Sequence, residues 1–527
     1  MTPSHPSRRR GRAILAAVAI AVALPASALA ANGYQTSSPS YVMSSGAVAG
    51  VQFVPLVNSG EEVFGTIFEG IPDGIGVAPG PRGRGFIDLY VTHEQSHVPF
   101  GGFADFQDSS VSRVRLDVAS KSIIDMDVAI PPSAGFIRFC TAFMAGPEHG
   151  FPHYTFFANE ESNDIVKVPP GAPYGSDPSV APHRQAGYAV YLDTRTGKYD
   201  VLPNHGRHNH ENTVIVPGGW KHRITALSTD DTFTFPSTVE RPNLSQLYMP
   251  MSHNWRQFQK DNTTLWAFRV TGTGGDPIDP ADPFNDANDY FEIQSGDAWT
   301  GEFIPVPGDV ARGETASRPQ DALEDWSNAN NVFQFIRLED IAYDPDHPRT
   351  VYIADTGNSR LVESDDTGRL WRAPSGGSTS IGRIFKFVFN ADDPTVVDEF
   401  SILAQADDPG MGGFVPMRNP DNMDAGHNSL MVQEDTSNAK VWMHSLATGT
   451  WTHVATAVQP TAETSGIVDV SRWFGPGWWA LDVQSHVNES EEPGQIWTGQ
   501  PGGPAEGTVY TARREDGQLL LMQVPGS

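Results

Sequence analysis

Residues 206–216 read Gly206-Arg207-His208-Asn209-His210-Glu211-Asn212-Thr213-Val214-Ile215-Val216. The first half is polar and rich in side chains that bind metal ions, and the second half is a β-branched apolar run typical of a strand. Alternate residues of a strand share a face, so His208 and His210 point one way and Glu211 points the other. A lone histidine in such a place more often forms a hydrogen bond than a metal bond. We therefore regard Glu211 as the candidate ligand.

Other stretches show the reverse order, in which an apolar strand runs out into acids or amides. They are residues 86–91 before Thr92-His93-Glu94, 154–158 before Asn159-Glu160-Glu161, 224–227 before Ser228-Thr229-Asp230-Asp231, 351–354 before Asp355, 430–432 before Gln433-Glu434-Asp435, and 478–481 before Asp482. Glu94, Glu160 and Asp230 are separated by 66 and 70 residues, which indicates a loose internal repeat stretched by loops.

Further strand signals lie between these stretches, and helix signals are confined to residues 316–335. The strand signals cover residues 111–116, 188–199 (strand, turn, strand), 265–270, 383–389 and 441–454 (a hairpin). The 51 glycines and 42 prolines fit many turns and short strands better than long helices. We expect an all-β fold, a β-propeller of six blades with loop and short-helix insertions, because radial repetition of small sheets suits this pattern. The acid-ended strands would then gather around one mouth of the central channel.

The N-terminus has the features of a secretory signal peptide. A basic segment with Arg8, Arg9, Arg10 and Arg12 precedes a short apolar core, and Ala28-Leu29-Ala30 suits signal peptidase. The arginine run also suggests the twin-arginine route, and a retained N-terminal anchor is the alternative. We expect a signal peptide over residues 1–30, a lead-in over 31–84 and the propeller over 85–527, in a protein that is secreted to the periplasm or exterior.

The chain is strongly acidic, with a formal net charge of −28. Loss of residues 1–30 removes four arginines and no acid, leaving 31 basic against 63 acidic residues. Such a surface repels nucleic acid and anionic lipid and attracts cations. No second apolar run is long enough for a membrane span, so we expect neither nucleic-acid partners nor stable membrane insertion after cleavage. The sequence predicts no oligomeric state.

Carboxylates gathered at one channel mouth repel one another unless a cation neutralises them. Calcium takes oxygen ligands alone, whereas iron or zinc would also use nitrogen or sulfur, which His93, His210 and Cys140 could provide. Cys140 is the single cysteine, so it has no internal disulfide and is either a small buried hydrophobe or a ligand. The alternative for the acids is that they are ordinary turn residues at strand ends.

Short motifs in this chain resemble those of the PhoX-type alkaline phosphatases, and they follow the same order over about residues 85–490. They are His93-Glu94, the segment around Cys140, Ala158-Asn159-Glu160-Glu161, Gly206-Arg207 with His210-Glu211, Thr229-Asp230-Asp231, Leu338-Glu339-Asp340-Ile341-Ala342-Tyr343-Asp344, Gly382-Arg383-Ile384-Phe385, Pro420-Asp421-Asn422-Met423, Glu463-Thr464-Ser465-Gly466 and Asp482-Val483-Gln484-Ser485-His486.

The resemblance implies a six-bladed propeller with iron (Fe3+) and calcium in the central channel, and hydrolysis of a small-molecule phosphate ester. It implies that Cys140, Glu211 and Glu339 hold iron and carry catalysis. The acids that it implies as calcium ligands or their surroundings are Glu94, Glu160, Glu161, Asp230, Asp231 and Asp340. A cysteine ligand suits iron, because a thiolate is a soft donor.

The sequence departs from this family at three places, one of which is a longer loop from Met144 to His153. Thr141-Ala142-Phe143 follow Cys140 where the family has glycines, and Leu338 stands where a proline usually precedes the glutamate. Two alternative functions therefore remain open. One is a calcium-dependent propeller hydrolase of another ester or of a lactone, which needs no thiolate. The other is a non-catalytic propeller that calcium stabilises and that binds through its surface.

Overall fold

The computed structural model describes Met1 and residues 33–527, except for 82–84, 97–107, 170, 173–182, 233–236, 239–240, 275–277, 280–286, 315–317, 365–367 and 498–504. Apart from Met1, the signal peptide predicted for residues 1–30 lies outside the described residues. Residues Gly33–Ser527 form one compact unit.

The unit is built from antiparallel strands that fall into six groups of four. In chain order of their first strands, the groups are β5 (Pro72–Pro79), β6 (Phe86–His93), β7 (Ser110–Asp117) and β8 (Ser122–Ile130); β9 (Phe139–Ala145), β10 (Thr155–Glu160), β13 (Ala189–Asp193) and β14 (Lys198–Val201); β15 (His210–Ile215), β16 (Ile224–Asp230), β17 (Leu247–Ser252) and β18 (Thr264–Gly272); β20 (Leu338–Tyr343), β21 (Thr350–Asp355), β25 (Arg383–Phe389) and β26 (Val396–Gln405); β27 (Pro420–Ala425), β28 (Ser429–Glu434), β29 (Lys440–Ser445) and β30 (Trp451–Ala457); and β31 (Glu463–Asp469), β32 (Trp478–Ile496), β33 (Val509–Gln523) and β2 (Gln52–Asn58).

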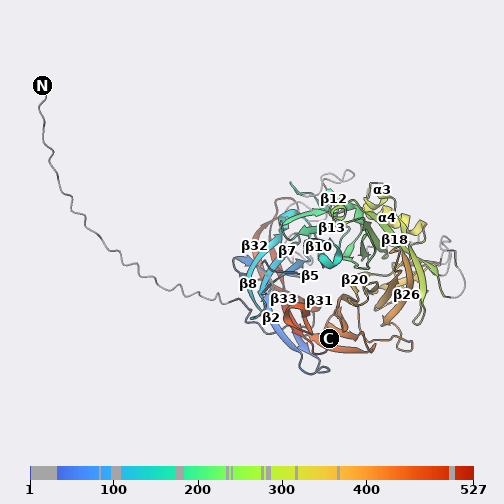
Figure 1. The fold of residues 1–527 in the computed structure, drawn as a ribbon. Helices are drawn as coiled ribbons and strands as arrows, with labels where there is room; N and C mark the ends of the chain where they lie inside the picture. The colour runs from blue at the N-terminus through green and yellow to red at the C-terminus, as the bar shows by residue number, and fades with distance from the viewer. Residues whose placement is uncertain are drawn as a thin grey trace. The chain divides into compact units, whose positions relative to one another are not determined.

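The first strands of these groups surround a central channel. Each contacts the next in a closed ring of β5, β9, β15, β20, β27 and β31, and β31 contacts β5 again. Figure 1 shows β5, β20 and β31 near the centre and β8, β2 and β26 at the rim. The predicted all-β propeller is therefore confirmed. The number of blades stays a prediction, because β19 (Trp299–Pro305) joins β18 to β26 and makes two groups one nine-stranded sheet.

The N-terminal strands close the ring onto the end of the chain. β2 pairs with β33, and β1 (Val42–Ser44) pairs with β30. A propeller closed in this way leaves no open edge between its first and last sheets. The predicted boundary at residue 85 lies between β5 and β6, which pair directly with each other. The described residues before this boundary supply strands to four sheets, because β1, β2 and β5 join three different sheets and β3 (Glu62–Val63) pairs with β4 (Thr66–Ile67) in a fourth.

Hydrophobic side chains fill the space between neighbouring sheets. One cluster combines Leu56 and Val57 of β2 with Val77, Leu89 and Leu519, and another is rich in phenylalanine, including Phe268, Phe335, Phe385 and Phe400. Comparable clusters lie between the other neighbouring pairs of sheets. The two faces of each sheet are thus buried against its neighbours, which explains why strands such as β16 and β28 are buried along their whole length.

Short helices and strands lie outside the six groups of four strands. They are α2 (Trp255–Phe258), α3 (Gly308–Ala311), α4 (Pro319–Ala329), α5 (Ser471–Phe474), η1 (Pro132–Ala134), η2 (Pro147–His149), η3 (Pro203–His205), β3 (Glu62–Val63), β4 (Thr66–Ile67), β11 (Ile165–Lys167), β12 (His183–Gln185), β22 (Ser359–Glu363), β23 (Leu370–Arg372) and β24 (Ser378–Thr379). α4 confirms the short helix predicted within residues 316–335. Within the described part of the chain, none of the helices is long and apolar enough to cross a membrane.

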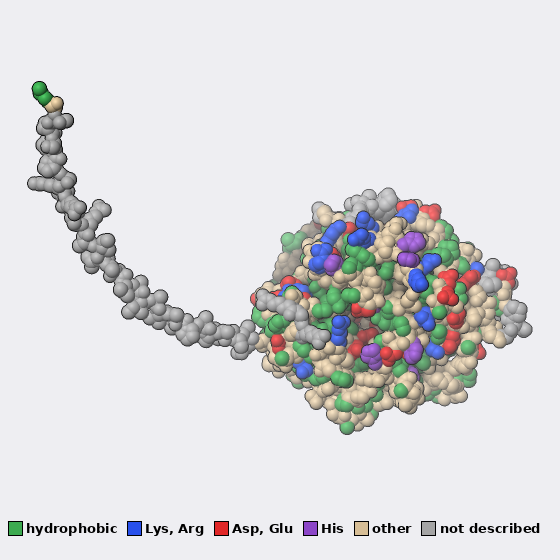
Figure 2. All heavy atoms as spheres, in the orientation of Figure 1, with side chains coloured by type: hydrophobic (Ala, Val, Ile, Leu, Met, Phe, Trp, Pro, Cys, Tyr) green, Lys and Arg blue, Asp and Glu red, His purple; other side chains and the backbone are tan. Residues whose placement is uncertain are grey.

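Surface charge is mixed on the face drawn in Figure 2. Acidic and basic side chains are interspersed there, with hydrophobic side chains scattered between them. The large hydrophobic side chains that are exposed, among them Met43, Phe64 and Val458, come from distant parts of the chain. Scattered apolar residues of this kind are normal for a protein surface.

All six acid-ended stretches form strands, but they are not the strands that line the channel. They are the second strands β6, β10, β16, β21, β28 and β32. In an antiparallel pair, the end of the second strand lies beside the start of the first. Their acids therefore reach the same mouth from one strand further out.

We predict that Leu56→Ala destabilises the whole unit, because β2 completes the sheet that holds the end of the chain. Leu56 is fully buried in the cluster between β2 and β5. The loss of packing should lower the free energy of unfolding by about 2–5 kcal/mol in urea titrations. Val458→Ala, at a side chain that is 51% exposed, is the control and should change it by less than about 0.5 kcal/mol. Equal effects of the two substitutions would contradict closure through β2.

Candidate metal centre

Five of the six first strands carry the same irregularity at their start. Where β5 pairs with β6, Pro72 faces His93 and Ile75 faces Val91, so two residues of β5 lie opposite one residue of β6. The same β-bulge occurs at the starts of β9, β15, β20 and β27. A bulge re-aims a side chain relative to a regular strand. The residue just after the first pair is, in these five strands, Asp73, Cys140, Glu211, Glu339 and Asp421.

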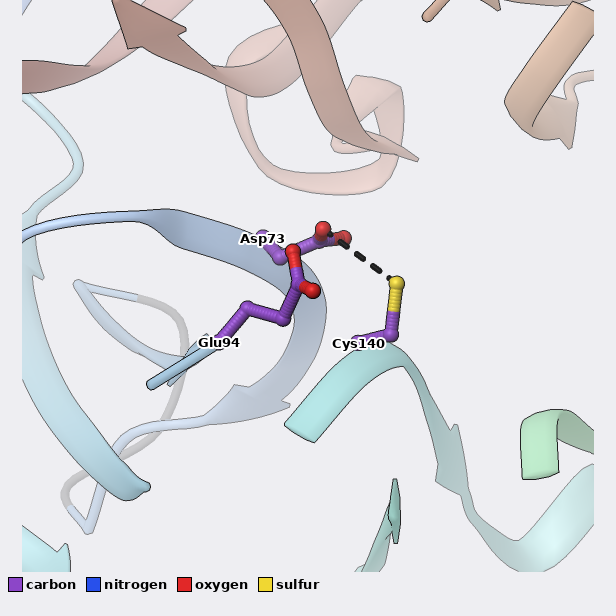
Figure 3. Close-up of side chains that lie close together, drawn as sticks. All are labelled: Asp73, Glu94 and Cys140. Atoms are coloured by element: carbon purple, nitrogen blue, oxygen red, sulfur yellow. Dashed lines mark hydrogen bonds between the residues drawn. The ribbon is translucent and has the colours of Figure 1, made fainter. Parts of the chain in front are cut away.

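These five side chains converge and are joined by two acids from the second strands. Three overlapping groups have ligand atoms within 4.8 Å of one another: Asp73 with Glu94 and Cys140, Cys140 with Glu161 and Glu211, and Glu211 with Glu339 and Asp421. Figure 3 shows the first group, in which the Cys140 thiol donates to Asp73 Oδ2 over 3.4 Å. Glu211 thus lies near both Cys140 and Glu339, although they are far apart in sequence.

The sixth first strand approaches the centre through its backbone. β31 has a bulge at Gly466, between the pairs Ser465–Asp482 and Ile467–Leu481. A Cβ at Gly466 would lie 2.0 Å from the carbonyl oxygen of Asp73. Only glycine allows this approach. The second strand β32 supplies the polar groups here, since Gln484 donates to Asp73 Oδ2 over 2.9 Å and to Glu94 Oε2 over 3.3 Å.

Buried oxygen atoms at this mouth lack hydrogen-bond partners among the described residues. They are Glu211 Oε2, Asp421 Oδ1, Asn422 Oδ1, Gln484 Oε1 and both carboxylate oxygens of Asp482. A buried acceptor without a partner costs free energy, so its presence calls for a ligand. Carboxylate and amide oxygens suit hard cations, and the Cys140 thiolate suits a transition metal. The residues of the centre therefore fit bound metal ions.

The electrostatics of the centre lead to the same conclusion. Burial, followed by the neighbouring Glu94, raises the pKa of Asp73 well above its usual range. Burial, followed by Asp73, raises the pKa of Glu211 in the same way. Burial raises the pKa of the Cys140 thiol, and nearby carboxylates raise it further. The group cannot be fully ionised without compensating positive charge, which either protons or metal cations supply.

The cationic side chain of Arg337 lies beside the acid cluster. Arg337 donates to both carboxylate oxygens of Asp231, from Nε over 2.8 Å and from Nη2 over 2.5 Å. Its Nη2 also lies 3.4 Å from Glu339 Oε1, and its side chain is 23% exposed. Asp231 is fully buried. The bidentate pair fixes the plane of the guanidinium at the edge of the centre.

The resemblance implies that Glu160 holds or surrounds calcium. In the structure, Glu160 instead forms a buried ion pair away from the centre. Its carboxylate pairs with Arg184, with Nη1 donating to Oε2 over 2.8 Å and Nη2 donating to Oε1. The backbone amides of Ile137 and Tyr188 also donate to it. Both charged side chains are fully buried. Glu160 is the last residue of β10 and Glu161 follows it, and of the two only Glu161 reaches the centre.

Asp230 and Asp340 also lie outside the three groups. Asp230 accepts a hydrogen bond from Thr232 over 2.6 Å and faces Gln320 of α4. Asp340 accepts from the side chain of Asn212 and from the backbone amide of Met423. It therefore ties β15, β20 and β27 together. These two acids stabilise the surroundings of the centre instead of facing its middle.

The histidines of the opening stretch pack away from the centre. The rings of His208 and His210 are tilted by 37° relative to each other with centroids 3.6 Å apart, and both approach Ser228 Oγ. This agrees with the predicted orientation opposite to Glu211. His93 also faces away from the centre, bonded to Ser112 Oγ and the carbonyl of Gly70.

Sequence reasoning missed Asp73 and Asp421 as candidate ligands. Asp73 fell in the expected lead-in, and Asp421 lay in a resembling motif without an assigned role. A signal was present in both cases, because each follows a proline at the start of a first strand, as Pro72-Asp73 and Pro420-Asp421. Comparing the starts of strands, and not only their ends, would have revealed both.

Comparisons with known proteins support the fold. No protein-family model matches the chain, and no curated protein matches it. Among solved structures, the PhoX of Pseudomonas fluorescens in complex with vanadate, a transition state analogue, matches with a TM-score of 0.58 and 14% identity, over 93% of this chain and 97% of that one. The β-propeller domain of Cps50 (Swd1) from Myceliophteria thermophila matches with a TM-score of 0.33 and 8% identity, over 80% and 95%. At 14% identity, the likeness to PhoX shows a PhoX-like fold and no more.

We predict that the metal-free protein becomes more stable as the pH falls from 8 to 6.5. The acids of the centre have raised pKa values when folded, so the folded state holds more protons than the unfolded state across this range. His486, whose pKa two flanking glutamates raise to about 11, acts in the same direction. Buried histidines such as His149, with a pKa lowered to about 3, oppose the trend increasingly as the pH approaches about 6.5, where the unfolded state begins to protonate them, so the window ends there.

Thermal unfolding in the presence of a chelator measures this effect. The melting temperature should rise on acidification across the window, and Glu211→Gln should make the rise smaller by removing one acid of the group. A melting temperature that stays constant or falls would show that the acids of the centre bind no more protons in the folded state than in the unfolded state.

Proposed function

We propose that this protein is a secreted, metal-dependent phosphatase that hydrolyses small-molecule phosphomonoesters in its central channel. One observation carries the proposal: five matching bulges direct Asp73, Cys140, Glu211, Glu339 and Asp421 into one buried centre beside Arg337. Unpartnered oxygens suit cations, and an arginine at their edge suits an anion that those cations also bind. A phosphate ester meets both requirements.

The structural comparison supports phosphoryl chemistry in particular. The PhoX neighbour binds vanadate as a transition state analogue, and it shares the fold over most of both chains. Carried over as a proposal, this makes a phosphoryl group the reacting part of the substrate. Neither alternative function needs a thiol among the carboxylates. These alternatives are a calcium-dependent lactonase and a non-catalytic propeller.

We assign iron to Cys140, Glu211 and Glu339, and calcium to the oxygen-rich remainder of the centre. That remainder comprises Glu94, Glu161, Asp73 and Asp421, together with the unpartnered carboxylate of Asp482. When bound, such cations supply charge neutralisation and Lewis acidity to a phosphoryl group.

The chain's own residues orient the substrate and hold the ligands. Arg337 binds phosphoryl oxygens through its guanidinium, whose plane Asp231 fixes. The Thr141 hydroxyl donates to Glu211 Oε1, and the Asn422 amide donates to Asp73 Oδ1 over 3.2 Å. These contacts hold the two carboxylates in place before substrate arrives, which lowers the cost of reorganisation in the transition state.

The organisation of the chain follows from this function. Residues 1–30 act as the signal peptide that delivers the protein to the periplasm or exterior, and residues 33–527 form the catalytic unit. Export places the enzyme where phosphate esters and calcium are accessible from outside the cytoplasm.

Hydrolysis of a phosphomonoester panel by protein loaded with iron and calcium tests the proposal. Arg337→Gln should lower kcat/KM by about 10- to 100-fold, because a charge-assisted hydrogen bond to the reacting group is lost. Arg349→Gln removes an exposed arginine between β20 and β21 at the other ends of these strands, and it should leave kcat/KM unchanged. Equal effects of the two substitutions would remove Arg337 from the site.

Cys140→Ala tests the thiolate separately. Iron content, measured by elemental analysis, should fall together with activity, while bound calcium remains. A variant that keeps full activity would instead favour a calcium-dependent hydrolase without a thiolate. A loaded wild-type protein that hydrolyses none of the panel would refute the phosphatase proposal itself.

A further inference from the structure

The central channel continues behind the candidate metal centre as a rear cavity of about 410 Å³. Residues from all six first strands line it, together with residues that follow these strands. The candidate metal ligands lie at the starts of the first strands, whereas the middles and ends of the same strands line the rear cavity, so it belongs to the opposite mouth. Its volume lies in the range of about 300–1,000 Å³ that is usual for small-molecule sites.

A polar layer separates the rear cavity from the metal centre. The Asn212 side chain donates to Asp340 Oδ1, and the Met423 amide donates to Asp340 Oδ2 over 2.8 Å. Asn212 and Asp340 directly follow Glu211 and Glu339 in sequence, so this layer lies immediately behind the centre. Because the protein itself satisfies the Asp340 carboxylate, the rear cavity is a separate site rather than an extension of the centre.

A hydrogen-bond donor without an acceptor lines the rear cavity. The Gly146 amide donates to His149 Nδ1 over 3.0 Å, so the neutral ring carries its proton on Nε2. Burial keeps this ring neutral, since it lowers the pKa of His149 to about 3. His149 Nε2 therefore donates to the Tyr343 hydroxyl oxygen over 2.8 Å. The hydroxyl proton of Tyr343 must point elsewhere, and none of the described residues accepts it.

Aromatic packing holds this donor in place. The His149 ring packs edge-to-face against both Phe143 and Tyr343, with centroid distances of 5.0 Å and 5.8 Å. The His149 side chain is only 4% exposed. The direction of the Tyr343 hydroxyl is thus set before a ligand arrives, which lowers the cost of binding.

The end of β31 supplies an acceptor to the same cavity. Asp469 Oδ1 accepts from the Ser471 amide over 2.8 Å, while no described residue donates to its Oδ2. The Asp469 amide donates to Asp424 Oδ2 over 2.7 Å, and the Ala425 amide donates to Asp424 Oδ1 over 2.8 Å. These bonds fix both aspartates and leave one carboxylate oxygen of Asp469 available to a ligand.

Two aromatic side chains and one cation complete the part of the lining that matters for recognition. Tyr154 and Trp473 both line the rear cavity, and the Arg472 guanidinium carbon lies 5.5 Å from the centroid of the Trp473 ring. Burial raises the pKa of Tyr154, Glu148 raises it further and Arg472 lowers it. Charges of both signs therefore lie close to the Tyr154 hydroxyl.

We propose that the rear cavity binds a sugar, at a site separate from the proposed phosphatase centre. The aspartates of the lining disfavour an anion, whereas the Tyr343 donor and Arg472 disfavour a simple cation. Hydroxyl groups both donate and accept, so a neutral polyol satisfies Tyr343 and Asp469 together. The ring carbons of a sugar also present an apolar face that packs on the aromatic rings of Tyr154 and Trp473.

Calorimetric titration of the full metal-loaded protein with glucose, galactose, mannose, N-acetylglucosamine and maltose tests this site. At least one of these sugars should bind with a Kd of about 1 mM or tighter. Tyr343→Phe keeps the ring and loses the donor, so it should weaken that Kd about tenfold. Asp469→Asn keeps an acceptor for the Ser471 amide and replaces the available oxygen by an amide nitrogen, so it should have a similar effect. Tyr352→Phe, the matched control, removes a hydroxyl of β21 outside the cavity and should leave the Kd unchanged.

Putrescine and benzoate serve as the cationic and anionic comparisons, and neither should bind in a manner that depends on Tyr343. The melting temperatures of the variants should lie within about 3 °C of wild type, so that weaker binding reports the lost contact and not unfolding. No binding of any sugar at about 50 mM, or binding that Tyr343→Phe and Asp469→Asn both leave unchanged, would overturn the sugar site. Tyr343-dependent binding of putrescine or benzoate without any sugar would overturn it as well.

Discussion

Repulsion among buried carboxylates is the constraint on which the rest of this structure depends. Asp73, Glu211, Glu339 and Asp421 converge with the Cys140 thiol in a space largely closed to water. Burial and proximity both penalise their charged forms. A fold that gathers these groups gains nothing in stability from them while the centre holds only protons. Cations that bind at the centre neutralise these charges, and this best explains why the groups converge. The fold then tolerates an unfavourable burial of acids because the bound cations serve its function.

The propeller supplies the geometry that this convergence needs. Each first strand begins at the same mouth, and a bulge at that point turns one side chain toward the channel while the strand beyond it remains regularly paired. The ring must be closed for these starts to face one another, and β2 closes it by pairing with β33. Apolar clusters between the sheets then hold each strand start in place, so the precision of the centre derives from packing far from it.

Much of the fold could be predicted from the sequence, because the strand pattern and its acidic ends recur along the chain. Glu211 was identified from its own stretch, since strand alternation separates it from His208 and His210. The inner position of β5 was not predictable in this way. The segment around Asp73 is rich in glycine, and only the pairing of β5 with β6 and its contact with β9 make it a channel strand.

The same limit explains the acids that were assigned too broadly. Glu160 and Glu161 are adjacent in sequence and equally acidic, yet one pairs with Arg184 and the other reaches the centre. Which of them faces the channel depends on the register of β10 and on the distant Arg184. Similarly, Asp340 follows Glu339 directly, and the bulge in β20 sends it to Asn212 and Met423 instead. Register and bulges are properties of strand pairs, and a single strand does not contain them.

Anomalous diffraction from crystals of the metal-loaded protein, recorded on both sides of the iron absorption edge, tests the central claim most directly. The account predicts an iron peak among Cys140, Glu211 and Glu339, with further cation density beside Asp73 and Asp421. Metal peaks confined to the outer surface, with the five converging side chains bonded only to protons and water, would contradict it.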